Sequence, residues 1–323
     1  MASSEKIRNL SFWGRWIYAL KIQSWPKLMV PFLLGQSYGV VNANEVSWIP
    51  LVLGLAYNVF LLGFIVLLND YADVEVDTIK RQLFPANCSP KTIPDGILSK
   101  KTVLIVGLSF GFLSILTAVF LELYTEKPYI FILSIISIVV FMFYSLPPIK
   151  LNYRGGGEIL EMLGVGFFLP TFHFYIQYRL LFDLEFGIIL ILSTIFALAS
   201  ALASGMSDEK SDTLGGKTTF ITLIGNNKVR KIIVFLCFIN TMLMFFFLKY
   251  FNASFSIGLT IVMILFLIYQ CSKLVQISPS AVTNNFEAQR IFKDHLHKAI
   301  WGSFVLVSGF KIYSVFLANK LLL

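Results

Sequence analysis

The sequence predicts an all-α, polytopic membrane protein, and three observations lead to this prediction. The 323 residues are 57% hydrophobic and only 14% charged, and their mean hydropathy is +0.77, which is outside the range of soluble domains. Apolar segments of about 18 or more residues, each long enough to cross about 30 Å of hydrocarbon as a helix, recur along the whole chain. Because a bilayer offers no water to the backbone, such segments must be helical.

We expect nine membrane-spanning helices around a central cavity, in a single domain that covers residues 1–323. The first segment is the least regular, since Pro26, Lys27 and Pro31 occupy its opening turns. The preceding part, residues 1–25, is expected to be cytoplasmic, with an amphipathic helix over 12–25 at the membrane interface. Residues 69–101 and 206–231 are expected to form loops that cap the helices. The nine segments are 26–43, 48–68, 102–121, 128–146, 159–178, 186–205, 232–250, 254–271 and 299–319.

The basic residues predict the orientation. When the nine segments alternate in direction, all but five of the 26 Lys and Arg residues lie on the side of the amino terminus. The exceptions are Lys127, Arg179, Lys249, Lys320 and, inside the last segment, Lys311. The positive-inside rule therefore places the amino terminus and both cap loops in the cytoplasm, and the carboxyl terminus outside, in a bacterial-type inner or plasma membrane. The net charge of +8 then reflects topology, and we expect no binding of nucleic acid.

The chemistry is expected in the stretch Asn69–Asp77, NDYADVEVD, directly after the second apolar segment. On one continuous helix, Asp70, Asp73 and Asp77 fall within about 60° of one another, whereas Glu75 points away. Carboxylates this close repel one another unless a cation lies among them, and hard oxygen ligands suit Mg²⁺, usually shared with a substrate phosphate. A solvated, charged helix end is the alternative interpretation.

A second acid motif repeats the pattern. Asp208 and Asp212 are one helical turn apart and follow the apolar segment 186–205. Two acid-rich helix ends of this kind could face each other across a cavity and hold two metal ions that bind a diphosphate. We therefore predict a metal site made of Asp70, Asp73, Asp77, Asp208 and Asp212. All of these except Asp77 are also candidate catalytic residues.

Polar and basic side chains near the two motifs are candidates for diphosphate binding. Lys80 and Arg81 follow Asp77 by three and four positions and could neutralise phosphate oxygens, although positive charge in a cytoplasmic loop also follows from the positive-inside rule alone. The predicted diphosphate-binding set is Asn69, Arg81, Lys91, Tyr144, Lys150 and Lys217.

Three other features are not expected to form separate nucleotide, catalytic or metal sites. The step Gly215–Thr219, GGKTT, looks like the end of a Walker loop, but it lacks the first glycine and a preceding strand, which argues against a nucleotide-binding loop. His173 lies in an apolar, aromatic segment and is expected to be a hydrogen-bonded core residue. The three cysteines show no metal-ligand spacing.

Taken together, NDYADVEVD at 69–77, YSLPPIKL at 144–151 and DEKSDTLGGKTT at 208–219, set in nine expected spans, resemble the UbiA superfamily of intramembrane prenyltransferases. The resemblance covers nearly the whole chain. It implies a ring of nine helices around a central cavity, capped by cytoplasmic loops. It also implies transfer of a prenyl group from an isoprenyl diphosphate to an acceptor, commonly an aromatic precursor of a respiratory quinone.

The resemblance extends to individual residues. Asn69, Asp70, Asp73 and Asp77 match the first motif, Asp208 and Asp212 match the second, and Tyr144 and Lys150 match the tyrosine and basic residue of the intervening loop. Two departures concern the acceptor: Lys91 stands where the family often has an arginine in an RTxxRPLPSG-like segment, and Met206-Ser207 replaces the asparagine pair of the dihydroxynaphthoate branch.

The expected reaction is Mg²⁺-assisted ionisation of the diphosphate, followed by attack of an aromatic acceptor such as 4-hydroxybenzoate or 1,4-dihydroxy-2-naphthoate on the allylic cation. Tetrapyrrole and glycerol-phosphate lipid acceptors are alternatives within the family. A phospholipid-type alcohol transferase is a further alternative, but its single motif with DG and AR elements is absent. A cation transporter would place acids in mid-span, whereas these acids follow the apolar segments.

Overall fold

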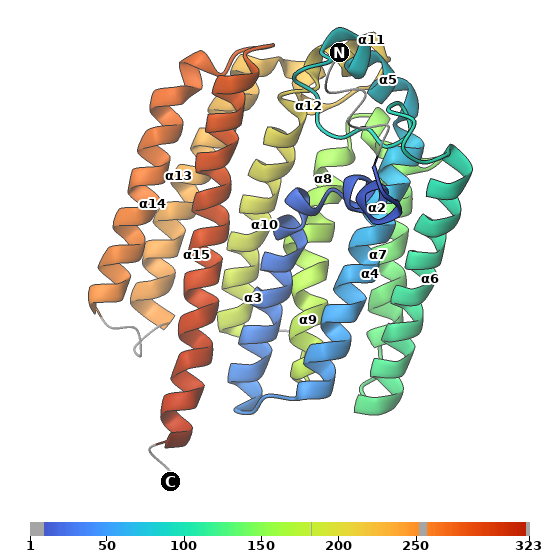
Figure 1. Ribbon diagram of the computed structural model, residues 1–323. Helices are drawn as coiled ribbons and strands as arrows, with labels where there is room; N and C mark the ends of the chain where they lie inside the picture. Colours follow the sequence, from blue (N-terminus) through green and yellow to red (C-terminus); the bar gives the residue numbers. More distant parts are fainter. Residues whose placement is uncertain (1–9, 182, 252–256, 321–323) are drawn as a thin grey trace.

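The computed structural model describes residues 10–181, 183–251 and 257–320. Long helices run side by side in one bundle, and the short helices α5, α11 and α12 gather at one end of it (Figure 1). The helix α15 starts at this end and finishes at the other (Figure 1). The amino-terminal segment 1–9, which belongs to the predicted interfacial part, lies outside the described residues.

The elements follow the order of the apolar segments. They are α2 (Phe12–Leu20), α3 (Pro26–Ala43), α4 (Trp48–Ala72), α5 (Val74–Leu83), α6 (Lys100–Thr125), α7 (Ile130–Ser145), α8 (Gly157–Leu163), η3 (Gly164–Phe168), α9 (Leu169–Gln177), α10 (Leu184–Gly205), α11 (Glu209–Leu214), α12 (Phe220–Ile224), α13 (Asn226–Phe251), α14 (Ile257–Ile277) and α15 (Phe286–Lys320). Single helical turns lie at Ile22–Ser24, Leu151–Tyr153 and Ser278–Ser280.

Among the described residues, six helices are long and apolar enough to cross a membrane by length and composition. They are α4, α6, the continuous unit α8–η3–α9, α10, α13 and α14. The remaining predicted segments are also helical and form α3, α7 and α15. These three helices do not meet the same criterion of length and apolar composition, so nine crossings stay a prediction. The first residues of the predicted segment 254–271 lie outside the described ranges.

Side chains at the helix starts explain several boundaries. Ser99 Oγ accepts a hydrogen bond from Thr102 N at 3.1 Å and so caps α6. Asp183 Oδ1 accepts one from Phe186 N at 2.7 Å and caps α10. Within the amphipathic segment expected over 12–25, the α-helix ends at Leu20, because Lys21 adopts a left-handed conformation with φ 47°, and a single helical turn follows at Ile22–Ser24. Its location at a membrane interface stays a prediction.

The helix α10 lies inside the bundle: about two thirds of the residues in its most apolar stretch are buried. Against it lies η3, one turn of π-helix between α8 and α9. A Cβ atom on Gly166 would lie 2.7 Å from both Ala197 Cβ and Thr194 Cα, so only glycine permits this approach of the two backbones. A π-helical turn inside an α-helix is frequent at functional sites.

The helix α15 is attached to α10 near both of its ends. Lys311 Nζ forms an ion pair with Glu185 Oε1 at 2.5 Å, and Lys293 Nζ donates to Ser207 Oγ, just beyond α10, at 3.0 Å. With 35 residues, α15 is about 52 Å long at 1.5 Å per residue, which exceeds the roughly 30 Å of a hydrocarbon core. Its first turns, including Lys293, therefore extend beyond the expected span.

Candidate active site

The two acid motifs lie at the same end of the bundle, where α5 packs against α11 (Figure 1). Gly215, at the end of α11, makes this packing possible, because a Cβ atom there would lie 2.6 Å from Val76 Cγ2. Lys217 then connects the motifs: its amide donates to Asp212 O at 2.8 Å, and its ammonium donates to Asp73 Oδ2 at 2.9 Å. Two acid motifs far apart in sequence thus form one site.

The prediction that Asp70, Asp73 and Asp77 share one continuous helix is wrong. The helix α4 ends at Ala72 and α5 begins at Val74, and the backbone of Asp73 between them has φ −97° and ψ 12°. The bend turns α5 across the end of the bundle. It nevertheless leaves all three carboxylates buried, with side chains 10% exposed or less, and Glu75 exposed as expected.

A lysine lies against four of the five motif carboxylates. Lys21, from the end of α2, pairs with Asp70, which also accepts a hydrogen bond from Thr92. The other pairs are Lys91 with Asp77, Lys217 with Asp73, and Lys80 with Asp208. Lys21 and Thr92 were not predicted as site residues, because nothing in the sequence links them to Asp70.

Asp73 lies at the centre of these contacts. Its Oδ2 accepts hydrogen bonds from Lys217 Nζ, from Asn69 Nδ2 at 3.3 Å and from Asn152 Nδ2 at 3.4 Å. Its Oδ1 is buried, and within the described part of the chain it has no hydrogen-bond partner. Such an oxygen is costly to leave unpaired, so it marks a position that a cationic ligand would stabilise.

Burial perturbs the ionisation of the groups around Asp73. It raises the pKa of Asp212 to about 6; the positive charge of Lys217 opposes this and the negative charge of Asp73 adds to it. Burial also lowers the pKa of Lys80 to about 7, with a further contribution from Lys91. The pKa of Lys217 is raised, because the charges of Asp73 and Asp212 outweigh the effect of its burial. These charges interact strongly because little water separates them.

Tyr153 forms an aromatic wall of the site that the sequence did not single out. Lys150 Nζ lies 3.4 Å from the centre of its ring and Lys217 Nζ lies 5.3 Å from it, both within the range of cation–π attraction. Burial and the charge of Asp73 raise the pKa of the Tyr153 hydroxyl. The predicted Tyr144 lies near Asn152, which contacts Asp73: a Cβ on Gly157 would be 3.2 Å from the Tyr144 ring and 2.8 Å from Asn152 Cα.

Arg81 is the predicted residue that the structure places elsewhere. Its guanidinium donates to Pro85 O at 3.1 Å, to Ser89 O at 3.3 Å and to Asp95 Oδ2 at 2.6 Å. Asp95 also accepts a hydrogen bond from Tyr18 of α2 at 2.5 Å. The contacts of Arg81 therefore fix the cap loop to itself, and Asp95 attaches the loop to α2. In the described chain, the contacts of Arg81 include no carboxylate of the two acid motifs.

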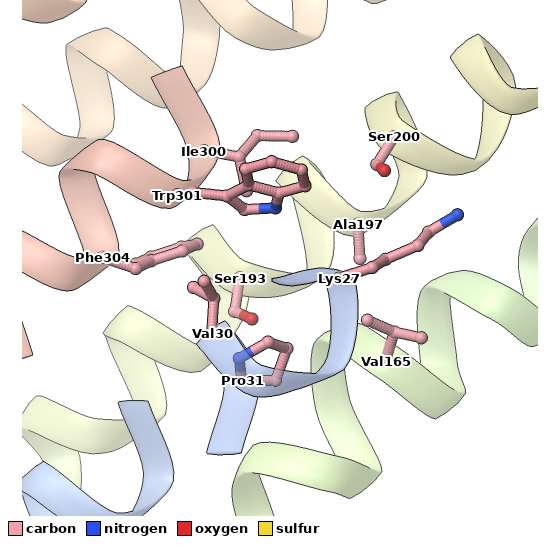
Figure 2. Close-up of a pocket in the computed structure, with 10 residues that line it drawn as sticks. All are labelled: Lys27, Val30, Pro31, Val165, Ser193, Ala197, Ser200, Ile300, Trp301 and Phe304. Atoms are coloured by element: carbon pink, nitrogen blue, oxygen red, sulfur yellow. The ribbon is translucent and has the colours of Figure 1, made fainter. Parts of the chain in front are cut away.

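Within the bundle there is a small cavity of about 20 Å³ between α3, η3, α10 and α15 (Figure 2). A cavity of this size holds about one water molecule, whereas ligand pockets measure about 300–1,000 Å³. A larger ligand must therefore displace side chains. The lining residues are Lys27, Val30, Pro31, Val165, Ser193, Ala197, Ser200, Ile300, Trp301 and Phe304.

His173 is a core residue, as expected from the sequence. It is fully buried, its Nδ1 lies 3.4 Å from Gln36 Nε2, and its ring contacts that of Phe32 edge-on at 4.8 Å. Among the described residues, no group of three or more His, Cys, Asp or Glu side chains is arranged to hold a metal ion. Lysine ammonium groups lie against the motif carboxylates instead.

Comparison with known proteins identifies relatives of this chain. The model of the UbiA prenyltransferase family matches residues 28–293. No curated protein sequence matches the chain.

Solved structures share the fold. A structure of digeranylgeranylglyceryl phosphate synthase aligns with a TM-score of 0.62 and 15% identity, over 93% of this chain and 98% of that one. A UbiA homolog from Archaeoglobus fulgidus bound to GPP and Mg²⁺ gives 0.60 and 18%, over 91% and 99%. A UbiA homolog from Aeropyrum pernix K1 gives 0.62 and 12%, over 86% and 97%.

Proposed function

Because the chain belongs to the UbiA prenyltransferase family, we propose that it transfers a prenyl group from an isoprenyl diphosphate to an aromatic acceptor in quinone biosynthesis. The acceptor would be of the 4-hydroxybenzoate or 1,4-dihydroxy-2-naphthoate type. The observation that supports this proposal most directly is the convergence of two acid motifs and several lysines at one end of an apolar helical bundle. Such a site suits a ligand with a charged diphosphate and a long apolar tail.

Mg²⁺ is the proposed cofactor. Asp70, Asp73, Asp77, Asp208 and Asp212 would hold it, since carboxylate oxygens are its preferred protein ligands. The buried, unpartnered Oδ1 of Asp73 fits this assignment, and the Archaeoglobus homolog bound to GPP and Mg²⁺ supports it. When bound, Mg²⁺ would neutralise the negative charge that develops on the diphosphate.

The lysines of the site would bind the diphosphate. In the structure Lys80, Lys91 and Lys217 neutralise carboxylates. Once a metal ion compensates those carboxylates, the flexible lysine side chains can turn to phosphate oxygens without leaving an uncompensated charge. Lys150, which lies on the ring of Tyr153, and the amide of Asn69 would add further donors.

The chemical step requires charge separation. The allylic carbon–oxygen bond breaks, and its electron pair stays on the diphosphate, where the lysine ammonium groups stabilise it. The allylic cation is stabilised by aromatic faces, for which Tyr153 is the nearest candidate to the lysines. A ring carbon of the acceptor then forms the new carbon–carbon bond, and the ring loses a proton to a carboxylate or to the diphosphate.

The experiment is Mg²⁺-dependent diphosphate release by the purified protein from geranylgeranyl diphosphate. Parallel reactions contain 4-hydroxybenzoate, 1,4-dihydroxy-2-naphthoate, a glycerol-phosphate lipid or no acceptor. Release stimulated by one aromatic acid, and abolished by a chelator, is expected. If a folded protein releases diphosphate only with the glycerol-phosphate lipid, the aromatic acceptor is wrong; with no release in any reaction, the proposed reaction fails for this donor.

A further inference from the structure

A larger cleft, of about 720 Å³, opens between the cap loop and the first turns of α15. It is distinct from the acid cluster, because none of the five motif aspartates is among its described lining residues. One wall is the loop 87–89 together with Ser207, and the other is one face of α15. The lining residues are Asn87, Cys88, Ser89, Ser207, Phe286, Glu287, Gln289, Arg290, Lys293, Asp294, His297 and Trp301.

The α15 wall presents two positive charges that lack a counter-ion. Among the described residues, neither Arg290 nor Lys293 forms an ion pair, and Lys293 Nζ donates only to the neutral Ser207 Oγ. Of the two carboxylates in the cleft, Asp294 is paired with Lys298 at 2.6 Å. The other, Glu287, is exposed; it lies one helical turn before Arg290, with which it forms no ion pair, and six residues before Lys293. Lys293 is half-buried and Arg290 is exposed, so both charges are accessible to the anionic group of a ligand.

The inner end of the cleft is positive and aromatic. Burial and the charge of Lys27 lower the pKa of Lys293 to about 8. The rings of His297 and Trp301 stack with centres 4.6 Å apart and an interplanar angle of 9°. This pair offers a flat apolar surface one and two helical turns beyond Lys293.

Trp301 also connects the cleft to the bundle interior, because it lines both the cleft and the small cavity (Figure 2). At the other wall, Ser207 directly precedes Asp208 of the second acid motif. A molecule whose anionic group binds Lys293 would therefore lie next to the residue that precedes the second acid motif, in a cleft that also includes Trp301.

We propose that this cleft is the acceptor site, in which Arg290 and Lys293 bind an anionic group of the acceptor and Trp301 contacts its apolar body. This inference rests on the proposed prenyl transfer and adds the location of the acceptor and its required negative charge. A carboxylate and a phosphate share this chemistry, so the test includes both.

The test compares the variants Arg290→Gln and Lys293→Met, singly and together, with Lys231→Met, at an exposed lysine of α13 outside the cleft lining, as a matched control. For the double variant we expect the KM for the acceptor to rise about tenfold or more, because two charge-assisted hydrogen bonds are lost. The KM for geranylgeranyl diphosphate should change less than about twofold. Lys231→Met should change neither value, and Lys293→Arg should retain most of the acceptor affinity.

A separate set of measurements tests whether the acceptor must carry a negative charge. The methyl ester of 4-hydroxybenzoate should bind the wild-type protein more weakly than the free acid does, and the double variant should no longer distinguish the two. If only a glycerol-phosphate lipid shows this dependence on Arg290 and Lys293, the anion is a phosphate rather than a carboxylate and the cleft assignment stands. A rise in the KM for the donor instead of the acceptor would assign the cleft to the diphosphate and overturn the inference.

A binding measurement separates this inference from the proposed function. Quenching of tryptophan fluorescence by 1,4-dihydroxy-2-naphthoate can be followed without turnover, in the wild type, in the double variant and in Trp301→Phe. Weaker binding to the double variant and loss of most of the signal in Trp301→Phe support the cleft even if no transfer is detected. Unchanged binding and unchanged acceptor KM in the double variant refute it, while Mg²⁺-dependent transfer by the same protein would leave the proposed function intact.

Discussion

Asp70 has both carboxylate oxygens occupied, one by Lys21 and the other by Thr92, and its side chain is 1% exposed. Asp70 therefore has two roles. It neutralises the charge of Lys21 at the end of the bundle, and it is a proposed metal ligand. Substitution of Asp70 alone therefore mixes a loss of stability with a loss of chemistry, and a pair of variants is needed to separate them.

We expect Asp70→Asn to abolish turnover and to lower the thermal midpoint, because Lys21 is left without its counter-ion. The double variant Lys21→Met with Asp70→Asn should recover the midpoint but not turnover. Asp208→Ala should also abolish turnover, and its midpoint should fall too, because Lys80, whose side chain is 5% exposed, is left without its counter-ion. Thermal unfolding and diphosphate release measure the two effects, and a near-normal rate in either single variant would refute the two-motif site.

The raised pKa of Asp212 predicts a pH dependence of Mg²⁺ binding. This carboxyl group, whose pKa is about 6, is neutral below that pH and then a poor metal ligand. As the pH falls through 6, the apparent Mg²⁺ affinity should decrease, by about tenfold per pH unit once protonation is complete. Magnesium titrations of turnover between pH 5 and 8 measure this. Asp212→Asn should bind Mg²⁺ weakly with a flatter profile, and an unchanged profile would contradict the assignment.

At this scale the sequence predicts the acids but not all of their partners. The spacing of the aspartates is local, so a helical pattern reveals it. Lys21 is 49 residues from Asp70, and Tyr153 and Asn152 belong to a loop that meets the acids only after α7 and α8 have packed. Those contacts depend on tertiary structure, which no local pattern contains. Arg81 shows the opposite case: its place next to the acids in sequence does not bring its guanidinium to them.

Helices are predicted well where apolar length determines them and less well at their ends. The predicted segment 26–43 agrees with α3 in both boundaries. The helix α4 is longer than the predicted segment 48–68: it continues to Ala72 and therefore includes Asn69 and Asp70. The break at Asp73 was not predicted, because no proline or glycine marks it; beyond the break, α5 packs against α11.

The contact between η3 and α10 gives a prediction for one glycine. Gly166→Ala should lower stability by about 1–3 kcal/mol, because the added methyl group meets Ala197 and Thr194 at distances that force the backbones apart. Gly187→Ala on α10, where nothing lies within 4 Å of the added atom, is the matched control and should be neutral or slightly stabilising. Thermal unfolding compares them, and equal midpoints would show that η3 tolerates the displacement.

For the whole molecule, the orientation in the membrane is predicted by charge alone. In a background without the three cysteines, Lys210→Cys at the acid-motif end should react with a membrane-impermeant maleimide only from the cytoplasmic side. Arg179→Cys, in the turn that follows α9, should react only from the other side. Labelling of intact cells and of inverted vesicles gives the comparison. The reverse pattern would place the acid motifs outside and contradict the positive-inside assignment.

The two attachments of α15 to α10 also constrain how this protein can change in length. Lys293 and Lys311 are 18 residues apart, so the two contacts lie about 27 Å apart along one straight helix. One inserted or deleted residue between them would rotate one contact relative to the other by about 100° and shift it by about 1.5 Å. Either the ion pair with Glu185 or the hydrogen bond to Ser207 would then be lost. The stretch between these lysines should accept substitutions far more readily than insertions or deletions, although it is largely a simple apolar helix.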